Sequence, residues 1–362
     1  MLRAEFSTGR DYANLSTDAG VRAPRAAPGI HGELMQERTE PSVETHRRRE
    51  REGAPINDRR LARAIEAGEF VRIAPGSFVR SADWRSLTPI DRHYLRVLEA
   101  IDRVQGPVTL MGAAAAAVHG IDQLSPWPDR IDIAAPRRGG GRSTGLIRRH
   151  TFSDLDLEVV PWRTHFITTP AQTAIDLARE RGFGAGVVAF DQVLWAKRRG
   201  GALATTADVH GILAHCRPRR GHPRAERALA FATPLADSVR ESESRVLIRM
   251  LGFPQPELQK RFVLRQGQIV YTDFWWEAFG HVGEFDGVGK YLDPELLAGR
   301  TPEEALLAEK DRGDELRRMT RALSRWRTPD LRDARRLYDI LVGDGLPSSR
   351  PRPPAGLLLG LS

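Results

Sequence analysis

The sequence predicts a multidomain protein of the mixed α/β class. The chain has 362 residues, and helical and strand-like apolar patterns alternate between residues 56 and 342. A mixed charge run at residues 46–52 precedes these patterns, and a basic, Pro-containing stretch at residues 216–225 interrupts them. We therefore expect three folded domains, at residues 55–90, 91–215 and 238–342, with a basic connector at 216–237.

Composition limits the class of protein further. No apolar run approaches the roughly 18 residues of a membrane span, and the N-terminus lacks the apolar stretch of a secretory signal. A single cysteine, Cys216, rules out an intramolecular disulfide framework and fits a reducing compartment. These features predict a cytoplasmic protein without membrane attachment. The net charge of +8 favours a polyanionic partner, although a GC-rich genome also enriches arginine.

Both ends of the chain are expected to be disordered. Residues 1–54 are rich in Arg, Glu, Gly and Pro and end in a mixed charge run, which is typical of a solvated tail. Residues 343–362 form a Pro-rich tail. The charge run has an alternative interpretation as an arm that binds phosphate.

The first domain combines a short helix with a hairpin. Asn57 is a suitable N-cap for a helix over residues 58–67, which Gly68 ends, and two short strands follow around an Ala-Pro-Gly turn. The helix and the hairpin carry four arginines: Arg59, Arg60 and Arg63 on the helix, and Arg72 on the hairpin. A basic helix followed directly by a basic hairpin predicts the second half of a winged helix, which binds DNA. The alternative is a helix–hairpin unit that only packs domains together.

The second domain is predicted to be α/β. Helices are expected at residues 109–119, after Thr169 and at 187–197, with strands at 130–134 and 156–160. Asp176 and Asp191 each lie beside an apolar stripe, so we expect them to cap or pair rather than to catalyse. His210, His215 and Cys216 lack a second metal half-site and predict a loop rather than a zinc site.

These two domains resemble a known family. The stretch GEFVRIAPGSFVR resembles the winged helix of AbiEi-type antitoxins, and ITTPAQTAIDLA, at residues 167–178, resembles their second domain. The resemblance covers about residues 56–195, although the helix that precedes the recognition helix in that family has no clear counterpart. It implies a DNA-binding regulator that represses its own operon and counters a nucleotidyltransferase toxin without direct contact.

In the third domain, two aromatic-rich runs on either side of residues 277–280 predict a β-hairpin. A centred four-residue loop places Asp273 directly opposite Glu284, and alternation places Asp286 on the face of Glu284. Like charges opposite each other are destabilising, so the pair requires a cation. That cation is either a metal ion or an arginine side chain, unless the register is shifted by one residue.

The third domain resembles a second family. A helix at 238–251, a strand at 259–264, the hairpin, a charged helix at 302–322 and a strand at 323–327 match the order of the PD-(D/E)XK nuclease core. The stretches ESESR, YTDFWW, EFDGVGKY, AEKDRGDELRRM and SRWRTPDL run in the order seen in very-short-patch-repair-like endonucleases. The resemblance covers about residues 238–331 and implies a restriction-endonuclease-like fold.

This second resemblance also implies site residues. Glu241 corresponds to the acid on the first helix, Asp273 to the central metal ligand and Glu284 to the second acid, with Mg²⁺ held by Asp273 and Glu284. Asp286 stands where many nucleases place the motif lysine, and Lys290 lies four residues further on. An acid early in a helix also simply complements the helix dipole, which is the alternative for Glu241.

Three functions follow from these observations. The first is a DNA-binding regulator of the antitoxin type whose third domain hydrolyses phosphodiesters with Mg²⁺ or is inactive. The second is a sequence-directed endodeoxyribonuclease without an antitoxin role. The third is a non-catalytic scaffold that binds nucleic acid.

Overall fold

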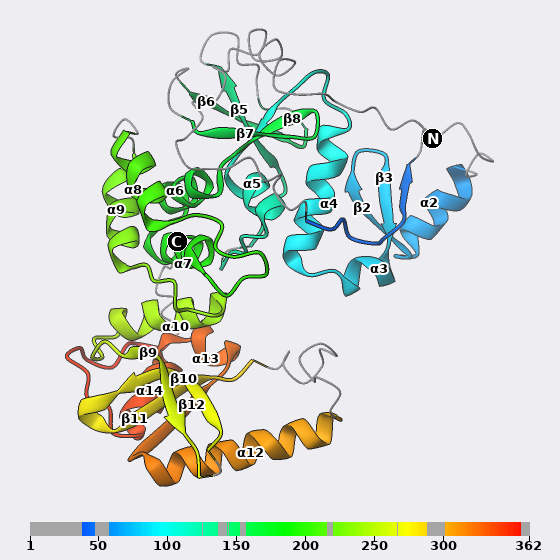
Figure 1. The fold of residues 1–362 in the computed structure, drawn as a ribbon. Helices are drawn as coiled ribbons and strands as arrows, with labels where there is room; N and C mark the ends of the chain where they lie inside the picture. The colour runs from blue at the N-terminus through cyan, green and yellow to red at the C-terminus, as the bar shows by residue number, and fades with distance from the viewer. Residues whose placement is uncertain are drawn as a thin grey trace. The chain divides into compact units, whose positions relative to one another are not determined.

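The computed structural model describes residues 38–47, 58–124, 126–136, 143, 145–152, 157–215, 220–265, 267–287 and 301–355 (Figure 1). They form two compact units: unit 1 is Met1–Glu180 with Leu203–Glu226, and unit 2 is Arg181–Ala202 with Arg227–Ser362. Three sheets and the helices around them confirm the mixed α/β class. No helix within the ranges above is both long and apolar enough to cross a membrane.

The first part of unit 1 is a three-stranded sheet beside a short helix. The helix α2 (Asp58–Glu66) and the hairpin of β2 (Phe70–Ala74) and β3 (Ser77–Arg80) confirm the predicted helix–hairpin pair. An additional strand, β1 (Thr45–Arg47), pairs antiparallel with β3, so the sheet order is β1-β3-β2. The expectation of a disordered tail through residue 54 is therefore wrong for residues 38–47. A strand of only three residues has too little pattern to be recognised in a charge-rich stretch.

A buried carboxylate ties this sheet to the helix α4 (Pro89–Ile101), which follows the short helix α3 (Ser81–Ser86). Glu99 on α4 is only 3% exposed. Its Oε1 accepts from Nε and Nη2 of Arg47 on β1, at 3.1 and 2.7 Å, and its Oε2 accepts from Ser77 on β3 at 2.7 Å. Arg103 lies 3.1 Å from the same oxygen. Because a buried charge is costly unless it is paired, these contacts fix the sheet on α4.

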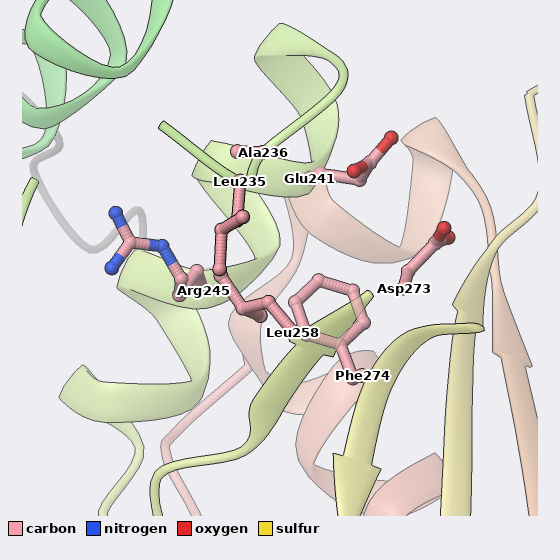
Figure 2. A pocket seen from close by; sticks show the side chains of 7 residues that line it. All are labelled: Leu235, Ala236, Glu241, Arg245, Leu258, Asp273 and Phe274. Carbon is pink, nitrogen blue, oxygen red and sulfur yellow. The ribbon is translucent and has the colours of Figure 1, made fainter. Parts of the chain in front are cut away.

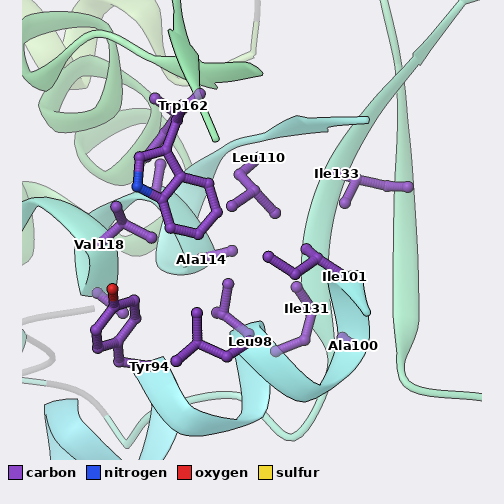
Figure 3. Close-up of a cluster of buried hydrophobic side chains, with 14 of the residues drawn as sticks. Tyr94, Leu98, Ala100, Ile101, Leu110, Ala114, Val118, Ile131, Ile133 and Trp162 are labelled. Atoms are coloured by element: carbon purple, nitrogen blue, oxygen red, sulfur yellow. The ribbon is translucent and has the colours of Figure 1, made fainter. Parts of the chain in front are cut away.

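The α/β part of unit 1 is built on a five-stranded sheet of order β6-β5-β4-β8-β7. Its strands are β4 (Thr109–Leu110), β5 (Ile131–Pro136), β6 (Ile147–Phe152), β7 (Val159–Trp162) and β8 (His165–Thr168). The core in Figure 3 joins Leu98 of α4, Ala114 of α5 (Gly112–His119) and Ile131 of β5. The predicted helix at 109–119 is corrected at its start, where Thr109 and Leu110 form a strand, and confirmed at its end, where Gly120 has φ 70°.

The boundary between the units differs from the one predicted at residue 215. The helix α6 (Pro170–Arg181) belongs to unit 1, as does α8 (Thr206–His215), but the helix between them, α7 (Phe183–Leu194), belongs to unit 2. Asp191 on α7 is fully buried, and its Oδ2 and Oδ1 accept from Arg245 Nη2 at 2.8 and 3.0 Å. The expectation that Asp191 pairs is confirmed. The expected connector at 216–237 contains a helix, α9 (His222–Phe231), and is not a simple loop.

Unit 2 has a four-stranded sheet of order β12-β11-β10-β9. In chain order its elements are α10 (Val239–Met250), β9 (Glu257–Val263), β10 (Ile269–Trp276), the 3-10 turn η1 (Glu277–Phe279), β11 (His281–Phe285), α12 (Pro302–Met319), β12 (Ala322–Trp326), α13 (Thr328–Arg332) and α14 (Ala334–Gly343). Strands β9, β10 and β11 form an antiparallel meander, and β12 is parallel to β11. The predicted order of helix, strand, hairpin, helix and strand is confirmed.

The predicted Pro-rich tail is partly ordered. Leu346 is 1% exposed and belongs to the core of unit 2. Ser349 donates its backbone N–H to Gly252 at 2.9 Å, and Arg350 reaches the carbonyl of Met250 at 2.8 Å. The expectation of disorder is therefore wrong for residues 344–355, because one leucine and a few backbone contacts attach this segment to α10.

A glycine next to the predicted acid Glu284 makes room for the aromatic core of unit 2. A Cβ on Gly283 would lie 2.7 Å from the ring of Trp326 and 2.9 Å from that of Trp276, which are both buried. Tight contacts of this kind leave no space for a methyl group.

We predict that Gly283→Ala lowers the free energy of unfolding by about 1–3 kcal/mol, because overpacking a filled core costs about that much. Urea midpoints measured by tryptophan fluorescence would check this. Gly343→Ala is the control, because a Cβ there meets nothing within 4 Å, and its effect should be neutral or slightly stabilising. Equal midpoints for the two variants would contradict the packing argument.

Candidate functional site

The β10–β11 hairpin has the register that the sequence predicts. Phe274 is opposite Gly283, Trp275 opposite Val282 and Trp276 opposite His281. Continuing this register by one residue places Asp273 opposite Glu284. The connection is the 3-10 turn η1, closed by Gly280 in the left-handed region at φ 56°. Asp273 Oδ2 accepts the backbone N–H of Phe285 at 2.8 Å, so its carboxylate reaches across to β11.

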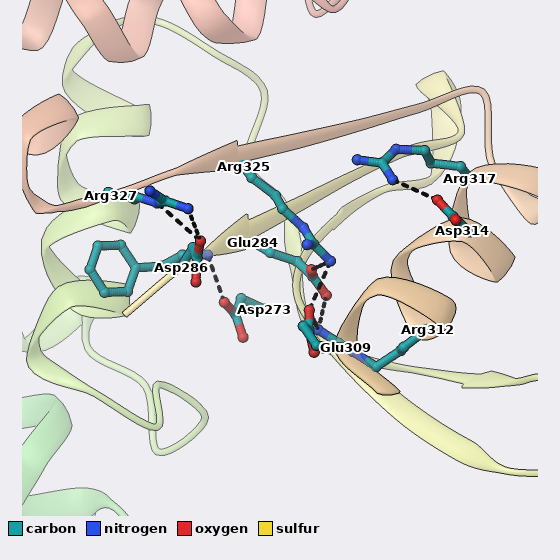
Figure 4. Close-up of polar contacts among 10 residues, drawn as sticks. Asp273, Glu284, Asp286, Glu309, Arg312, Asp314, Arg317, Arg325 and Arg327 are labelled. Atoms are coloured by element: carbon teal, nitrogen blue, oxygen red, sulfur yellow. Dashed lines mark hydrogen bonds and ion pairs between the residues drawn. The ribbon is translucent and has the colours of Figure 1, made fainter. Parts of the chain in front are cut away.

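Glu284 is neutralised by two arginines (Figure 4). Its side chain is almost completely buried; Oε1 lies 2.9 Å from Arg312 Nη2 and Oε2 lies 3.0 Å from Arg325 Nη2. A second carboxylate, Glu309, is 2.9 Å from Arg325 and receives two bonds from Arg312, at 2.9 and 3.0 Å. Two carboxylates and two guanidiniums thus alternate around one centre. Arginine, one of the two cations considered for Glu284, therefore contacts both of its carboxylate oxygens.

These arginines come from elements on either side of the acid. Arg312 lies on α12 and Arg325 on β12, the strand parallel to β11. Burial opposes the charge on Arg312, yet Glu309, Glu284 and Asp273 together raise the pKa of its guanidinium above the ordinary value. The guanidinium is therefore a permanent positive charge beside these three acids.

Asp286 has a separate partner. It follows the end of β11, and its Oδ2 accepts from Nε and Nη2 of Arg327 at 3.0 and 2.9 Å. The position where many nucleases carry a lysine therefore holds an ion-paired aspartate. Lys290, the other predicted site residue on this side, lies outside the described residues.

Glu241 lies near Asp273 at the start of α10. Its carboxylate accepts from the backbone N–H of Asp237 and from the hydroxyl of Ser238, each at 2.9 Å, while Ser238 caps the helix by accepting the backbone N–H of Glu241 at 3.1 Å. Glu241 and Asp273 both line a small pocket (Figure 2), with Leu235, Ala236, Arg245, Leu258 and Phe274. Burial, followed by the negative charge of Asp273, raises the pKa of Glu241 to about 7. The structure thus brings together two of the four predicted acids, Glu241 and Asp273, and pairs Glu284 and Asp286 with arginines.

The donor set fits Mg²⁺ poorly. This ion requires nearly octahedral oxygen coordination, and both oxygens of Glu284 already contact guanidinium groups. Across the part of the chain that the structure describes, no three His, Cys, Asp or Glu side chains are arranged to hold a metal ion. Binding at Asp273 and Glu284 would require Glu284 to exchange its ion pairs.

Sequence reasoning missed Glu309, Arg312 and Arg325 as parts of this cluster. The spacing of Glu309 and Arg312 suggests only a local ion pair on one face of a helix. Which face of α12 meets the sheet depends on tertiary packing, and no local pattern encodes it.

The predicted DNA-binding arginines lie on the surface of unit 1. Arg59, Arg63 and Arg72 are exposed, and the side chain of Arg60 lies outside the described residues. Arg63 makes a long bond of 3.3 Å to the carbonyl of Arg59, and Arg72 one of 3.4 Å to that of Ala74. Among the residues placed by the structure, neither Arg63 nor Arg72 has a carboxylate partner, so both charges remain available.

The raised pKa of Glu241 predicts a pH dependence of stability. Folding favours the neutral carboxyl, so its contribution is complete below the ordinary value of 4.5 and is lost as pH rises to about 7. From pH 5 to pH 8, the wild type should lose about 1–3 kcal/mol relative to Glu241→Gln, which is uncharged at both values. Urea midpoints of the two proteins at both pH values would check this; parallel changes would contradict it.

Comparison with known proteins gives two relatives. No family model matches the chain. "Uncharacterized protein MT2308" of Mycobacterium tuberculosis (strain CDC 1551 / Oshkosh) and "Uncharacterized protein Rv2248" of Mycobacterium tuberculosis (strain ATCC 25618 / H37Rv) are each 30% identical to it over 217 residues. The match covers 56% of this chain and 72% of each relative. At this identity and coverage, the chain belongs to the same family as these two mycobacterial proteins.

Proposed function

We propose that this protein is a DNA-binding regulator of the AbiEi-like antitoxin type, whose third domain has an endonuclease-like fold and does not cut DNA. The observation that carries the DNA-binding proposal is the basic helix α2 beside a three-stranded sheet, where Arg63 and Arg72 are exposed and have no carboxylate partner among the described residues. The resemblance of residues 56–195 to AbiEi-type antitoxins supports the assignment to regulators.

The third strand of the sheet, β1, supports a stably folded wing and not an isolated hairpin. A two-stranded hairpin is marginally stable alone, whereas three strands with an apolar face form a stable unit. Here Ile73 and Val79 of the sheet form a core with Leu95 of α4. The contacts of Glu99 with Arg47 and Ser77 add a second attachment. The hairpin that carries Arg72 is therefore held on a fixed base.

The charges suit a phosphate backbone. Arg63 on α2 and Arg72 on β2 are exposed, and Arg80 at the end of β3 lies over the ring of Phe70, 5.9 Å from its centroid. A recognition helix reads base edges in the major groove, and flanking arginines position it by contacting phosphates. In this proposal α2 enters the groove and the β2–β3 hairpin contacts the backbone.

The ion-paired carboxylates of unit 2, which we call the acid cluster (Glu284 and Glu309 with Arg312 and Arg325), favour a third domain without catalytic activity. A metal-dependent hydrolase uses carboxylates to hold the ion that activates water. Glu284 instead gives its oxygens to Arg312 and Arg325, and Asp286 pairs with Arg327. Under the antitoxin proposal, a gene for a nucleotidyltransferase toxin lies next to the gene for this protein, and the two proteins act without direct contact.

We predict that Arg63→Ala/Arg72→Ala weakens binding to duplex DNA from upstream of the gene by more than about tenfold at moderate salt. Each lost phosphate contact should also lower the slope of log K against log salt by about 0.9. Fluorescence anisotropy at several salt concentrations measures both quantities. Arg317→Ala/Arg318→Ala, which removes the same charge from exposed positions on α12, should bind like the wild type. Equal loss in both double variants would refute recognition by α2 and the hairpin.

Nuclease activity is tested separately. We expect the purified protein to leave supercoiled plasmid intact in Mg²⁺ or Mn²⁺, and Asp273→Asn to behave in the same way. Nicking by the wild type that is absent from Asp273→Asn would establish the alternative, a metal-dependent phosphodiester hydrolase.

A further inference from the structure

The acid cluster of unit 2 contains its own cations. Its two paired carboxylates are Glu284 from β11 and Glu309 from α12. Two guanidiniums lie among them, and the contacts from Arg312 and Arg325 to Glu284 and Glu309 measure 2.9–3.0 Å. Asp273 contributes further negative charge next to Arg312.

Burial makes a cation necessary at this place. Glu284 is 5% exposed, and removing the partner of a buried charge typically costs several kcal/mol. A divalent metal ion and a pair of guanidiniums both satisfy this requirement. They exclude each other at Glu284, since each carboxylate oxygen already lies within 3.0 Å of an arginine nitrogen.

A glycine in α12 indicates that the fold accommodates the guanidinium. Glycine inside a helix costs about 1 kcal/mol relative to alanine. Gly313 nevertheless lies in the interior of α12 and is buried, and a Cβ there would come within 2.9 Å of Arg325 Nη2. The absence of a side chain at Gly313 leaves the space through which Arg325 reaches both Glu284 and Glu309.

We propose that Arg312 and Arg325 are the resident cations of this cluster and prevent divalent metal ions from binding there. The stability of unit 2 then depends on arginine at the place where the endonuclease-like fold implies a metal ion. The proposal concerns unit 2 alone and does not depend on DNA binding by unit 1. It follows from the disagreement between the expected metal ligands and the partners that Glu284 has.

The test compares the full-length wild type with Arg312→Gln/Arg325→Gln. We expect wild-type melting temperatures to be the same in 5 mM MnCl₂ and in NaCl of matched ionic strength. The double variant should melt several degrees lower in NaCl and regain most of that loss in MnCl₂, because a bound ion stabilises the folded state by mass action. Mn²⁺ electron paramagnetic resonance should detect about one bound equivalent in the double variant only.

Two further variants serve as controls. Adding Asp273→Asn to the double variant should abolish the recovery, which would locate the ion at this cluster. Arg317→Gln/Arg318→Gln removes the same charge from exposed positions of the same helix and should neither bind Mn²⁺ nor lose much stability.

Three results would overturn the proposal. The first is Mn²⁺ binding to the wild type that Asp273→Asn removes, because arginines and metal would then coexist. The second is a folded Arg312→Gln/Arg325→Gln variant that binds no more Mn²⁺ than the wild type. The third is a double variant that stays unfolded with and without Mn²⁺, because an ion could then not replace the guanidiniums.

Discussion

A carboxylate buried on β11 must be neutralised, and the form of unit 2 follows from how this is done. The hairpin register puts Asp273 opposite Glu284; Asp273 is partly exposed and accepts the backbone N–H of Phe285, whereas the buried Glu284 needs a cation. Arg325 satisfies the requirement from the adjacent parallel strand and Arg312 from the helix that crosses the sheet. The same ion pairs therefore compensate the charge of Glu284 and attach α12 to the sheet. Among the residues of α12 whose burial is described, only Gly313 and Leu316 are buried.

The same arrangement recurs where other elements join. Glu99 holds β1 and β3 on α4 through Arg47 and Ser77, Asp132 on β5 binds Arg148 and His150 on β6, and Asp191 on α7 binds Arg245 on α10. Arginine suits these positions because its planar fork satisfies a carboxylate with two parallel donors. Much of the basic content of the chain is therefore structural. Net charge overstates the surface available to DNA, and exposed residues such as Arg63 and Arg72 carry more weight than the total of +8.

The sequence was sufficient for elements whose signals are local. A four-residue connection between aromatic runs predicted the register of Asp273 and Glu284, and glycines marked the ends of α2 and α5 and the turn of the β2–β3 hairpin. Features that depend on distant partners were not predictable. The strand β1 is defined by pairing with β3. Contacts with distant residues, such as those of Asp191 with Arg245 and Ser242, attach α7 to unit 2, and the arginines of Glu284 are set by the face of α12 that meets the sheet. The candidate site was thus predicted in its acids and missed in its cations.

The path of the chain between the units limits how the protein can be divided. Because α7 precedes α8 in sequence but belongs to unit 2, the chain passes from unit 1 to unit 2, back to unit 1 and again to unit 2. A fragment beginning at Ser238, the natural choice for isolating the endonuclease-like region, would lack Asp191 and leave the guanidinium of Arg245 buried without its carboxylate. Any fragment of the protein, and any recombination event that transfers this region between genes, must therefore include α7, whose contact with Arg245 spans 54 residues.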